Sequence, residues 1–261
     1  MIPKVIHWCW FGRGKVPRLA KKCIKSWRKY LPDYEIKLWN EDNFDIHSVK
    51  YVEEAYEKRK FAFVTDYVRL YALYTEGGIY MDSDVEVLKR IDRFHELPAF
   101  TGYESEVGCI TGIMGSEKGG QWVKDLMDEY HARPFVLPDG SLNTKTNVHY
   151  TSCMMKEKGV VLDCMKETVV PEYLTIYPRD YFCPKLWASG DITITENTYT
   201  IHHFNASWWE PRKWWIRWTD NHIGPRAAYY VGYFWRPFPV VVRSLLGAVK
   251  RRVLRVIGKG K

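Results

Sequence analysis

The sequence predicts an α/β fold with one large domain over residues 1–220 and a basic tail over residues 221–261. The chain opens with an apolar strand, an amphipathic helix and a second strand, an order that favours a parallel sheet. Of its 261 residues, 46% are hydrophobic, enough for a core of ordinary size. A later apolar strand runs directly into two aspartates, at the edge where open α/β sheets bind ligands.

The first three elements follow from local signals. Residues 4–10 form an apolar run of strand length, and two glycines mark the turn after it. Pro17 suits the first turn of a helix, whose apolar positions recur to Leu31 before Pro32 ends it. Residues 34–39 alternate as a second strand does.

The next elements lead to the two aspartates. Residues 49–58 predict a surface helix, and residues 61–76 a buried helix closed by Gly77-Gly78, where a C-cap glycine belongs. Residues 79–81 predict a strand that ends at Asp82-Ser83-Asp84. Weaker patterns predict strands at 99–103, 109–114 and 199–204, and helices at 121–130 and 148–158.

The positive charge is concentrated at the C-terminal end. The net charge is +8, from 39 Lys and Arg against 31 Asp and Glu, and residues 221–261 hold nine basic residues and no acidic one. Residues 1–220 are therefore close to neutral, which argues against a nucleic-acid-binding protein. The nine basic residues are Arg226, Arg236, Arg243, Lys250, Arg251, Arg252, Arg255, Lys259 and Lys261.

The tail has the composition of an in-plane membrane anchor. Aromatic and aliphatic residues recur between its basic residues, and its helical stretch places apolar side chains on one side. An anionic membrane surface is the partner this composition predicts. The alternative is a terminal helix that packs on the domain with its basic residues in solvent.

The cellular setting is inferred from what the sequence lacks. Its six cysteines are scattered without metal-binding spacing, and the first residues lack a signal-peptide layout. No apolar run approaches the roughly 20 residues that span a bilayer. We therefore expect a reduced, cytoplasmic protein associated with the inner face of the cell membrane.

Two pairs of residues suggest chemistry. Asp82 and Asp84 suit Mg²⁺ or Mn²⁺ shared with phosphate oxygens, although a solvated turn is the alternative. Asp66 and Arg69 share one face of the buried helix, where a structural ion pair explains them equally well.

Five spaced blocks resemble a known family. The chain resembles the glycosyltransferases of the DXD sugar-binding family, family 32, and most closely their bacterial capsule and polysaccharide members. The resemblance implies a GT-A-like nucleotide-sugar-binding fold, with a single Rossmann-like mixed sheet and flanking helices. It also implies Mn²⁺ or Mg²⁺ and sugar transfer from a UDP-sugar with retention of configuration. The blocks are residues 2–10, 23–27, 31–40, Asp66-x-x-Arg69 through Asp82-x-Asp84, and 201–208.

The resemblance also implies roles for individual residues. Asp66 and Arg69 would bind the donor sugar, Asp82 the ribose or sugar, and Asp84 the metal. Trp10 would stack on the uracil, although a core position is its structural alternative. The remaining donor-binding residues would be Ser207 and Trp208, which would close over the diphosphate.

Three further polar residues are candidates because of their positions. His202 and His203 are adjacent on a predicted strand, so they point to opposite faces and only one can reach the metal. We favour His202. Asn147 is a candidate for contact with the donor sugar, but a polar cluster at a helix start explains it as well. The tryptophans between residues 208 and 218 fit acceptor binding, membrane contact or plain packing.

The leading hypothesis is a peripheral enzyme that moves a hexose or N-acetylhexosamine from a UDP-sugar to a saccharide, lipid-linked acceptor in surface polysaccharide synthesis. A catalytically silent nucleotide- or glycan-binding protein is disfavoured because both aspartates and the Asp66/Arg69 pair are intact. A basic nucleic-acid or membrane adaptor is the third hypothesis. Its binding would survive metal removal and would ignore UDP.

Overall fold

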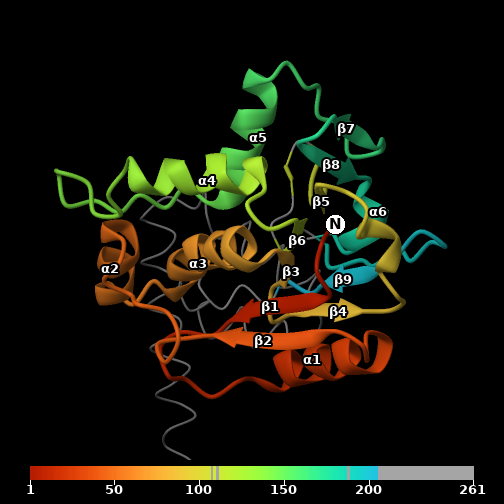
Figure 1. Cartoon of the computed structure of the whole chain (residues 1–261), viewed down its shortest axis with the longest axis horizontal. Helices are drawn as coiled ribbons and strands as arrows, with labels where there is room; N and C mark the ends of the chain where they lie inside the picture. The colour runs from red at the N-terminus through yellow and green to blue at the C-terminus, as the bar shows by residue number, and fades with distance from the viewer. Residues whose placement is uncertain (107, 110–111, 187–188, 205–261) are drawn as a thin grey trace, which may run out of the picture. The chain divides into compact units, whose positions relative to one another are not determined.

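The computed structural model describes residues 1–106, 108–109, 112–186 and 189–204 (Figure 1). The strands are β1 (Val5–Cys9), β2 (Glu35–Trp39), β3 (Gly78–Met81), β4 (Val85–Val87), β5 (Ala99–Gly102), β6 (Ile113–Ser116), β7 (Thr168–Val170), β8 (Leu174–Tyr177) and β9 (Thr200–His202). The helices are α1 (Arg18–Tyr30), α2 (Lys50–Glu57), α3 (Phe61–Glu76), α4 (Gln121–His131), α5 (Asn147–Glu157), α6 (Arg179–Phe182) and the 3₁₀ helix η1 (Asp92–Phe94).

The central sheet is mixed and seven-stranded, in the order β2-β1-β3-β6-β5-β8-β7. β1 runs parallel to both β2 and β3, as the strand, helix, strand opening predicts. β6 is antiparallel to β3 and β5, β8 is parallel to β5, and β7 closes the far edge antiparallel to β8. The predicted α/β class is confirmed.

A second, two-stranded sheet pairs β4 with β9 in antiparallel register. It aligns Val85 with His202 and Val87 with Thr200. The strand expected at residues 199–204 therefore belongs to this small sheet and is shorter than predicted. No sequence pattern predicts this pairing, because three-residue strands are too short to show periodicity.

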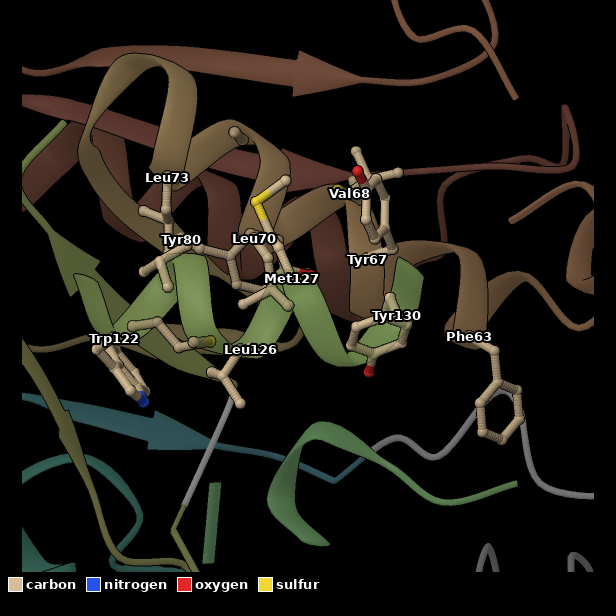
Figure 2. Packing of buried hydrophobic residues seen from close by; sticks show 14 of the residues in the cluster. Phe63, Tyr67, Val68, Leu70, Leu73, Tyr80, Trp122, Leu126, Met127 and Tyr130 are labelled. Carbon is tan, nitrogen blue, oxygen red and sulfur yellow. The ribbon is translucent and has the colours of Figure 1, made fainter. Parts of the chain in front are cut away.

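Each face of the central sheet carries its own hydrophobic cluster. Neighbouring strand residues alternate between them: Ile79 and Met81 of β3 point into the cluster that holds α1 and β4, and Tyr80 into the cluster that holds α2, α3 and α4. Figure 2 shows the cluster that contains Tyr80, where side chains of α3 and α4 pack together. Its labelled residues are Phe63, Tyr67, Val68, Leu70, Leu73, Tyr80, Trp122, Leu126, Met127 and Tyr130.

The middle of the chain needs the main corrections. The strand predicted at residues 109–114 begins later, at Ile113, and runs to Ser116, because pairing with β3 aligns Ile113 with Met81 and Ser116 with Gly78. Cys109 instead forms an isolated bridge with Tyr103. The short elements β4, β7, β8 and α6 were not predicted. The tail helix and the domain boundary at residue 220 lie outside the described residues.

Candidate active site

The site begins at one edge of the central sheet, where the neighbouring parallel strands β1 and β3 both end. His7 of β1 is level with Tyr80 of β3, so the residues that follow the two strands meet at this edge. Asp82 comes directly after β3, and its backbone N–H donates a hydrogen bond of 2.8 Å to the Gly112 carbonyl. This edge is where open α/β sheets bind ligands.

Asp82, Asp84 and His202 converge at this edge, with one ligand atom of each within 4.8 Å of the others. The His202 Nε2 atom lies 3.4 Å from Asp84 Oδ1 and 3.7 Å from Asp82 Oδ2. The side chains of Asp84 and His202 are only 13% and 12% exposed. The pairing of β4 with β9 brings these residues together across more than a hundred positions of sequence.

The donor set fits a divalent cation. Two largely buried carboxylates close together repel each other unless a positive charge lies between them. Burial alone would lower the pKa of His202, but Asp84 beside it raises that pKa well above 6.5. The cluster therefore draws positive charge to this point, and two carboxylate oxygens with one imidazole nitrogen form a metal-binding set.

Gly112 lets the backbone pass close to His202 and Asp82. A Cβ atom at this position would lie 3.1 Å from the His202 ring and 3.2 Å from Asp82 Oδ2. Even a methyl group would crowd both side chains. The sequence gives no sign of this role, because Gly112 is far from both residues along the chain.

The side chains of the two adjacent histidines point in different directions, as their positions on a strand predict. His202 lies beside the aspartates, whereas the His203 Nε2 atom is 2.8 Å from Glu86 Oε2. The backbone N–H of His203 also donates to the Asp84 carbonyl at 3.1 Å. His203 thus supports the segment that carries Asp84 and lies outside the cluster.

Arg69 of α3 connects Asp66 with Asp82. Its Nη2 atom lies 3.0 Å from Asp66 Oδ1 and 3.4 Å from Asp82 Oδ1. Its guanidinium carbon is 4.6 Å from the centroid of the Tyr80 ring, and the Tyr80 hydroxyl donates to Asp82 Oδ1 at 2.7 Å. The Asp66/Arg69 pair is therefore both a buried ion pair and part of the wall beside the metal cluster.

Asp66 is a buried carboxylate with an altered proton affinity. Burial, opposed by Arg69, raises the pKa of Asp66 to about 6. Asn147 is fully buried, and its Nδ2 donates to the Asp66 backbone carbonyl at 2.7 Å. Tyr130 donates in turn to the Asn147 side-chain oxygen. Asn147 therefore links the start of α5 to α3 at Asp66.

Of the other predicted donor-binding residues, the structure describes Trp10 only. Trp10 follows β1 at the same sheet edge and is half-buried, and its indole N–H donates to the Gly14 carbonyl at 2.7 Å. This hydrogen bond holds the Trp10 ring against the turn at Gly12–Gly14. Ser207 and Trp208 lie outside the described residues.

The sequence analysis missed Tyr80, Gly112 and Glu104. Tyr80 is in an apolar strand, where the pattern predicts a core residue. Glu104 lies in a polar segment after β5, and the charged groups acting on it are His202, Asp82 and Arg69. Tyr80 is close to Asp82 in the chain, whereas only the fold brings Gly112 beside Asp82 and His202.

Comparison with known proteins points to sugar transfer. Residues 17–101 match the glycosyltransferase sugar-binding region containing a DXD motif. The matched segment, about a third of the chain, holds Asp66, Arg69, Asp82 and Asp84. It ends before Glu104 and His202.

The similar curated proteins are fungal. Inositol phosphoceramide mannosyltransferase 3 of Schizosaccharomyces pombe is 31% identical over 122 residues, which are 45% of this chain and 34% of that protein. Inositol phosphoceramide mannosyltransferase 2 of the same organism is 23% identical over 229 residues, or 85% of this chain and 63% of that protein. The chain thus spans about a third to two thirds of the length of these relatives.

Solved structures show weaker likenesses. The PaToxG glycosyltransferase has a TM-score of 0.45 at 16% identity, covering 60% of this chain and 69% of that one. A glycosyltransferase involved in the glycosylation of the major capsid of PBCV-1 has a TM-score of 0.42 at 14% identity, covering 78% and 95%. Within the described part of the chain, no helix has the length and apolar character needed to cross a membrane.

Proposed function

We propose that this protein is a metal-dependent glycosyltransferase of the GT-A type, which moves a sugar from a nucleoside diphosphate to an acceptor hydroxyl group. The observation that carries the proposal is the convergence of Asp82, Asp84 and His202 beside the Asp66/Arg69 pair. Four of these five residues lie in the segment that matches a sugar-binding family.

The metal cluster has a defined part in this proposal. Asp84 and His202, with Asp82 close by, would hold Mn²⁺ or Mg²⁺, and the imidazole favours Mn²⁺ because Mg²⁺ prefers oxygen ligands throughout. When bound, the cation would neutralise negative charge on the departing diphosphate. Tyr80 and Arg69 fix the other oxygen of Asp82, so the carboxylate has one defined orientation.

Donor binding is assigned to the wall beside the metal cluster. Carboxylate and guanidinium groups hydrogen-bond sugar hydroxyls, so Asp66 and Arg69 are the donor-sugar residues, with Asp82 shared between sugar and metal. Asn147 supports Asp66 by donating a hydrogen bond to the Asp66 backbone carbonyl. Trp10 would stack on the base, and Ser207 and Trp208 would close over the diphosphate.

The donor is a nucleotide sugar whose class an assay can identify. The family resemblance indicates a UDP-hexose or UDP-N-acetylhexosamine with retention of configuration, whereas the fungal relatives are named as mannosyltransferases. The test is release of nucleoside diphosphate with Mn²⁺ from UDP-glucose, UDP-galactose, their N-acetyl forms and GDP-mannose. We expect one donor to dominate, and NMR of the product reports the anomeric outcome.

The controls separate catalysis from binding. Chelation of the metal and Asp84→Ala should each abolish release, while Asp42→Asn, a change at an exposed carboxylate, should leave it unchanged. Release that persists without metal would refute the metal assignment. Binding of nucleotide sugar without any turnover would favour the silent binding protein instead.

We assign the acceptor to a lipid-borne saccharide or polyol. The names of the two fungal relatives specify an inositol phosphoceramide, and the basic tail is suited to an anionic membrane surface. Both suggest a hydroxyl-bearing headgroup at a membrane. Surface polysaccharide synthesis and the cytoplasmic face remain part of the proposal, and matched assays with free and lipid-linked acceptors test them.

A further inference from the structure

The small sheet of β4 and β9 is fastened to helix α1. Within the described residues its two strands pair only with each other, and β4 lies beside α1 (Figure 1). The Trp27 indole N–H of α1 donates to the Val85 carbonyl at 2.7 Å. The backbone N–H of Val87 donates to the Ser26 hydroxyl of α1 at 2.9 Å. These two bonds fix the backbone of the strand that begins directly after Asp84.

Glu86 joins β4 to both of its neighbours. Its Oε2 atom lies 2.8 Å from His203 Nε2 and accepts a hydrogen bond of 2.9 Å from Lys22 Nζ of α1. Glu86 is opposite Ile201 in the ladder and His203 is two residues further on, so strand alternation puts Glu86 and His203 on one face. Their side chains are only 17% and 16% exposed. The contact is therefore a largely buried link between the two strands.

The backbone on both sides of this link carries residues of the metal cluster. Asp84 precedes β4, and His202 is the last residue of β9. The backbone N–H of His203 donates to the Asp84 carbonyl at 3.1 Å, which extends the pairing of the strands to the cluster. Glu86 lies outside the group of Asp82, Asp84 and His202. Its contact with His203 can therefore set how far Asp84 lies from His202.

Metal affinity is sensitive to a contact of this kind. A bound cation needs its ligand atoms within about 0.2 Å of their preferred distances. Side chains that orient the ligands are therefore important, and replacing them typically weakens metal binding about 10- to 100-fold. The ion pair between Glu86 and Lys22 should matter less, because the Lys22 side chain is 62% exposed to solvent.

We propose that Glu86 is a positioning residue for the metal. By holding His203, it keeps the side chains of Asp84 and His202 at the separation that the cation requires, and it does not itself bind the cation. The inference deepens the proposed function and rests on it, because the cation is part of that proposal. Since this effect precedes substrate binding, it is measured with the metal alone.

The test measures Mn²⁺ binding to the full-length protein by electron paramagnetic resonance, well below the melting temperatures of the metal-free variants. Glu86→Ala should raise the dissociation constant for Mn²⁺ about 10- to 100-fold. The matched control is Glu53→Ala, which removes a solvent-exposed contact of 2.7 Å between Glu53 and His47. This control should bind Mn²⁺ as the wild type does.

Glu86→Gln separates position from charge. Alanine and glutamine both remove the negative charge, but glutamine keeps an oxygen that accepts a hydrogen bond from His203. The Mn²⁺ affinity of Glu86→Gln should therefore lie much closer to wild type than that of Glu86→Ala. Equal losses in the two variants would show that the charge of Glu86 attracts the metal, and would overturn the positioning role.

A double-mutant cycle tests the link itself. If Glu86 acts through His203, the Glu86→Ala, His203→Ala double variant should lose no more Mn²⁺ affinity than the weaker-binding single variant. Additive losses would overturn the proposal, and so would wild-type affinity in Glu86→Ala. If Glu86→Ala does not fold, His203→Ala takes its place with the same expected loss.

The two proposals fail in different ways. If the wild-type protein binds no Mn²⁺, the metal assignment of the proposed function is wrong, and the role of Glu86 is wrong with it. If the wild type binds Mn²⁺ and Glu86→Ala binds it equally well, only the role of Glu86 is refuted. Mn²⁺ binding without any sugar transfer would refute the proposed activity and leave the comparison of Glu86 variants intact.

Discussion

Arg69 is the residue on which the geometry of the site depends most. One guanidinium nitrogen contacts carboxylates from α3 and from the segment after β3, while the face of the group covers the Tyr80 ring. A planar group with several donors can make these contacts together, whereas an ammonium group on a flexible stem cannot. Donor binding and local packing therefore depend on the same side chain.

The first prediction replaces Arg69 with lysine. Because Arg69→Lys keeps the charge but loses the planar fork, kcat/KM for the donor should fall about 100-fold or more, with a much smaller change in thermal stability. Activity and melting temperature are measured on the same preparation. Arg28→Lys, on an exposed position of α1, is the control.

The opposite result would identify a structural pair. Removing one partner of a buried ion pair commonly costs about 3–5 kcal/mol of folding free energy. If the melting temperature of Arg69→Lys drops sharply and activity falls only in proportion, Arg69 serves folding and has no part in donor binding.

At the scale of elements, α3 is held in place by a chain of hydrogen bonds from two other helices. Tyr130 of α4 donates to Asn147 of α5, and Asn147 donates to the backbone of Asp66 in α3. Apolar side chains of α3 and α4, Tyr130 among them, pack in the same hydrophobic cluster (Figure 2). The position of Asp66 thus depends on contacts from α4 and α5 as well as on α3 itself.

The second prediction is that Tyr130→Phe destabilises the protein through this chain. The Asn147 oxygen would be left buried without its donor, which costs about 1–3 kcal/mol. Urea denaturation monitored by circular dichroism measures the loss. Tyr30→Phe, at a partly exposed position of α1, should change stability little, and equal effects of the two substitutions would contradict the argument.

A third prediction concerns the ion pairs that join β2 to η1. Arg90 donates to Asp33 before β2 and to Asp92 of η1. Hydrogen bonds from Lys4 and Arg90 hold the pKa of Asp33 below the usual value of 3.8. The hydrogen bond from Arg90 is the main cause that lowers the pKa of Asp92 below the same value. The folded state therefore releases these protons more readily than the unfolded chain does.

The sign of the pH effect follows from linkage. Carboxylates with a lowered folded pKa stabilise the protein above the unfolded pKa of 3.8, and this contribution is lost as the pH falls through the folded pKa. Arg90→Gln should therefore lower the melting temperature at pH 7, with a difference from wild type that shrinks below pH 3.8. Arg28→Gln is the control, and a difference independent of pH would exclude the ion pairs as its cause.

For the whole molecule, the arrangement of the chain separates a nearly neutral domain from a basic end. Residues 1–220 carry almost no net charge, whereas the nine basic residues of 221–261 lie among aromatic and aliphatic ones. Attachment to an anionic surface would raise the local concentration of a lipid-borne acceptor without changing the chemistry. The candidate metal cluster of Asp82, Asp84 and His202 lies within the described residues.

The fourth prediction is that deleting the chain after Arg236 separates membrane binding from chemistry. Release of nucleoside diphosphate from the donor should remain, while flotation with anionic vesicles should weaken. Binding of the full-length protein should decline with rising salt, because salt screens charges over about 10 Å at 0.1 M. Vesicles of neutral lipid are the control.

Two results would contradict the anchor. Flotation of the shortened protein equal to that of the full chain would place the membrane contact elsewhere. An insoluble, inactive shortened protein would show that the tail packs on the domain as part of its core.

The sequence by itself determined the α/β class, the first five elements and the position of Asp82 and Asp84 after a buried strand. These features depend on local periodicity, glycine and proline signals and helix ends, which are encoded by residues close together in the chain. It also indicated that His202 and His203 face opposite ways, because alternation in a strand is a local property.

Tertiary structure decided how the site is assembled. The pairing of β4 with β9 selects His202 as the residue beside Asp84, and the pairing of β6 with β3 brings Gly112 against Asp82. Tyr80 carries no local signal, since an apolar strand has the same pattern whether or not it adjoins a site. Contacts between distant segments depend on the packing of the whole sheet, which no short window of sequence contains.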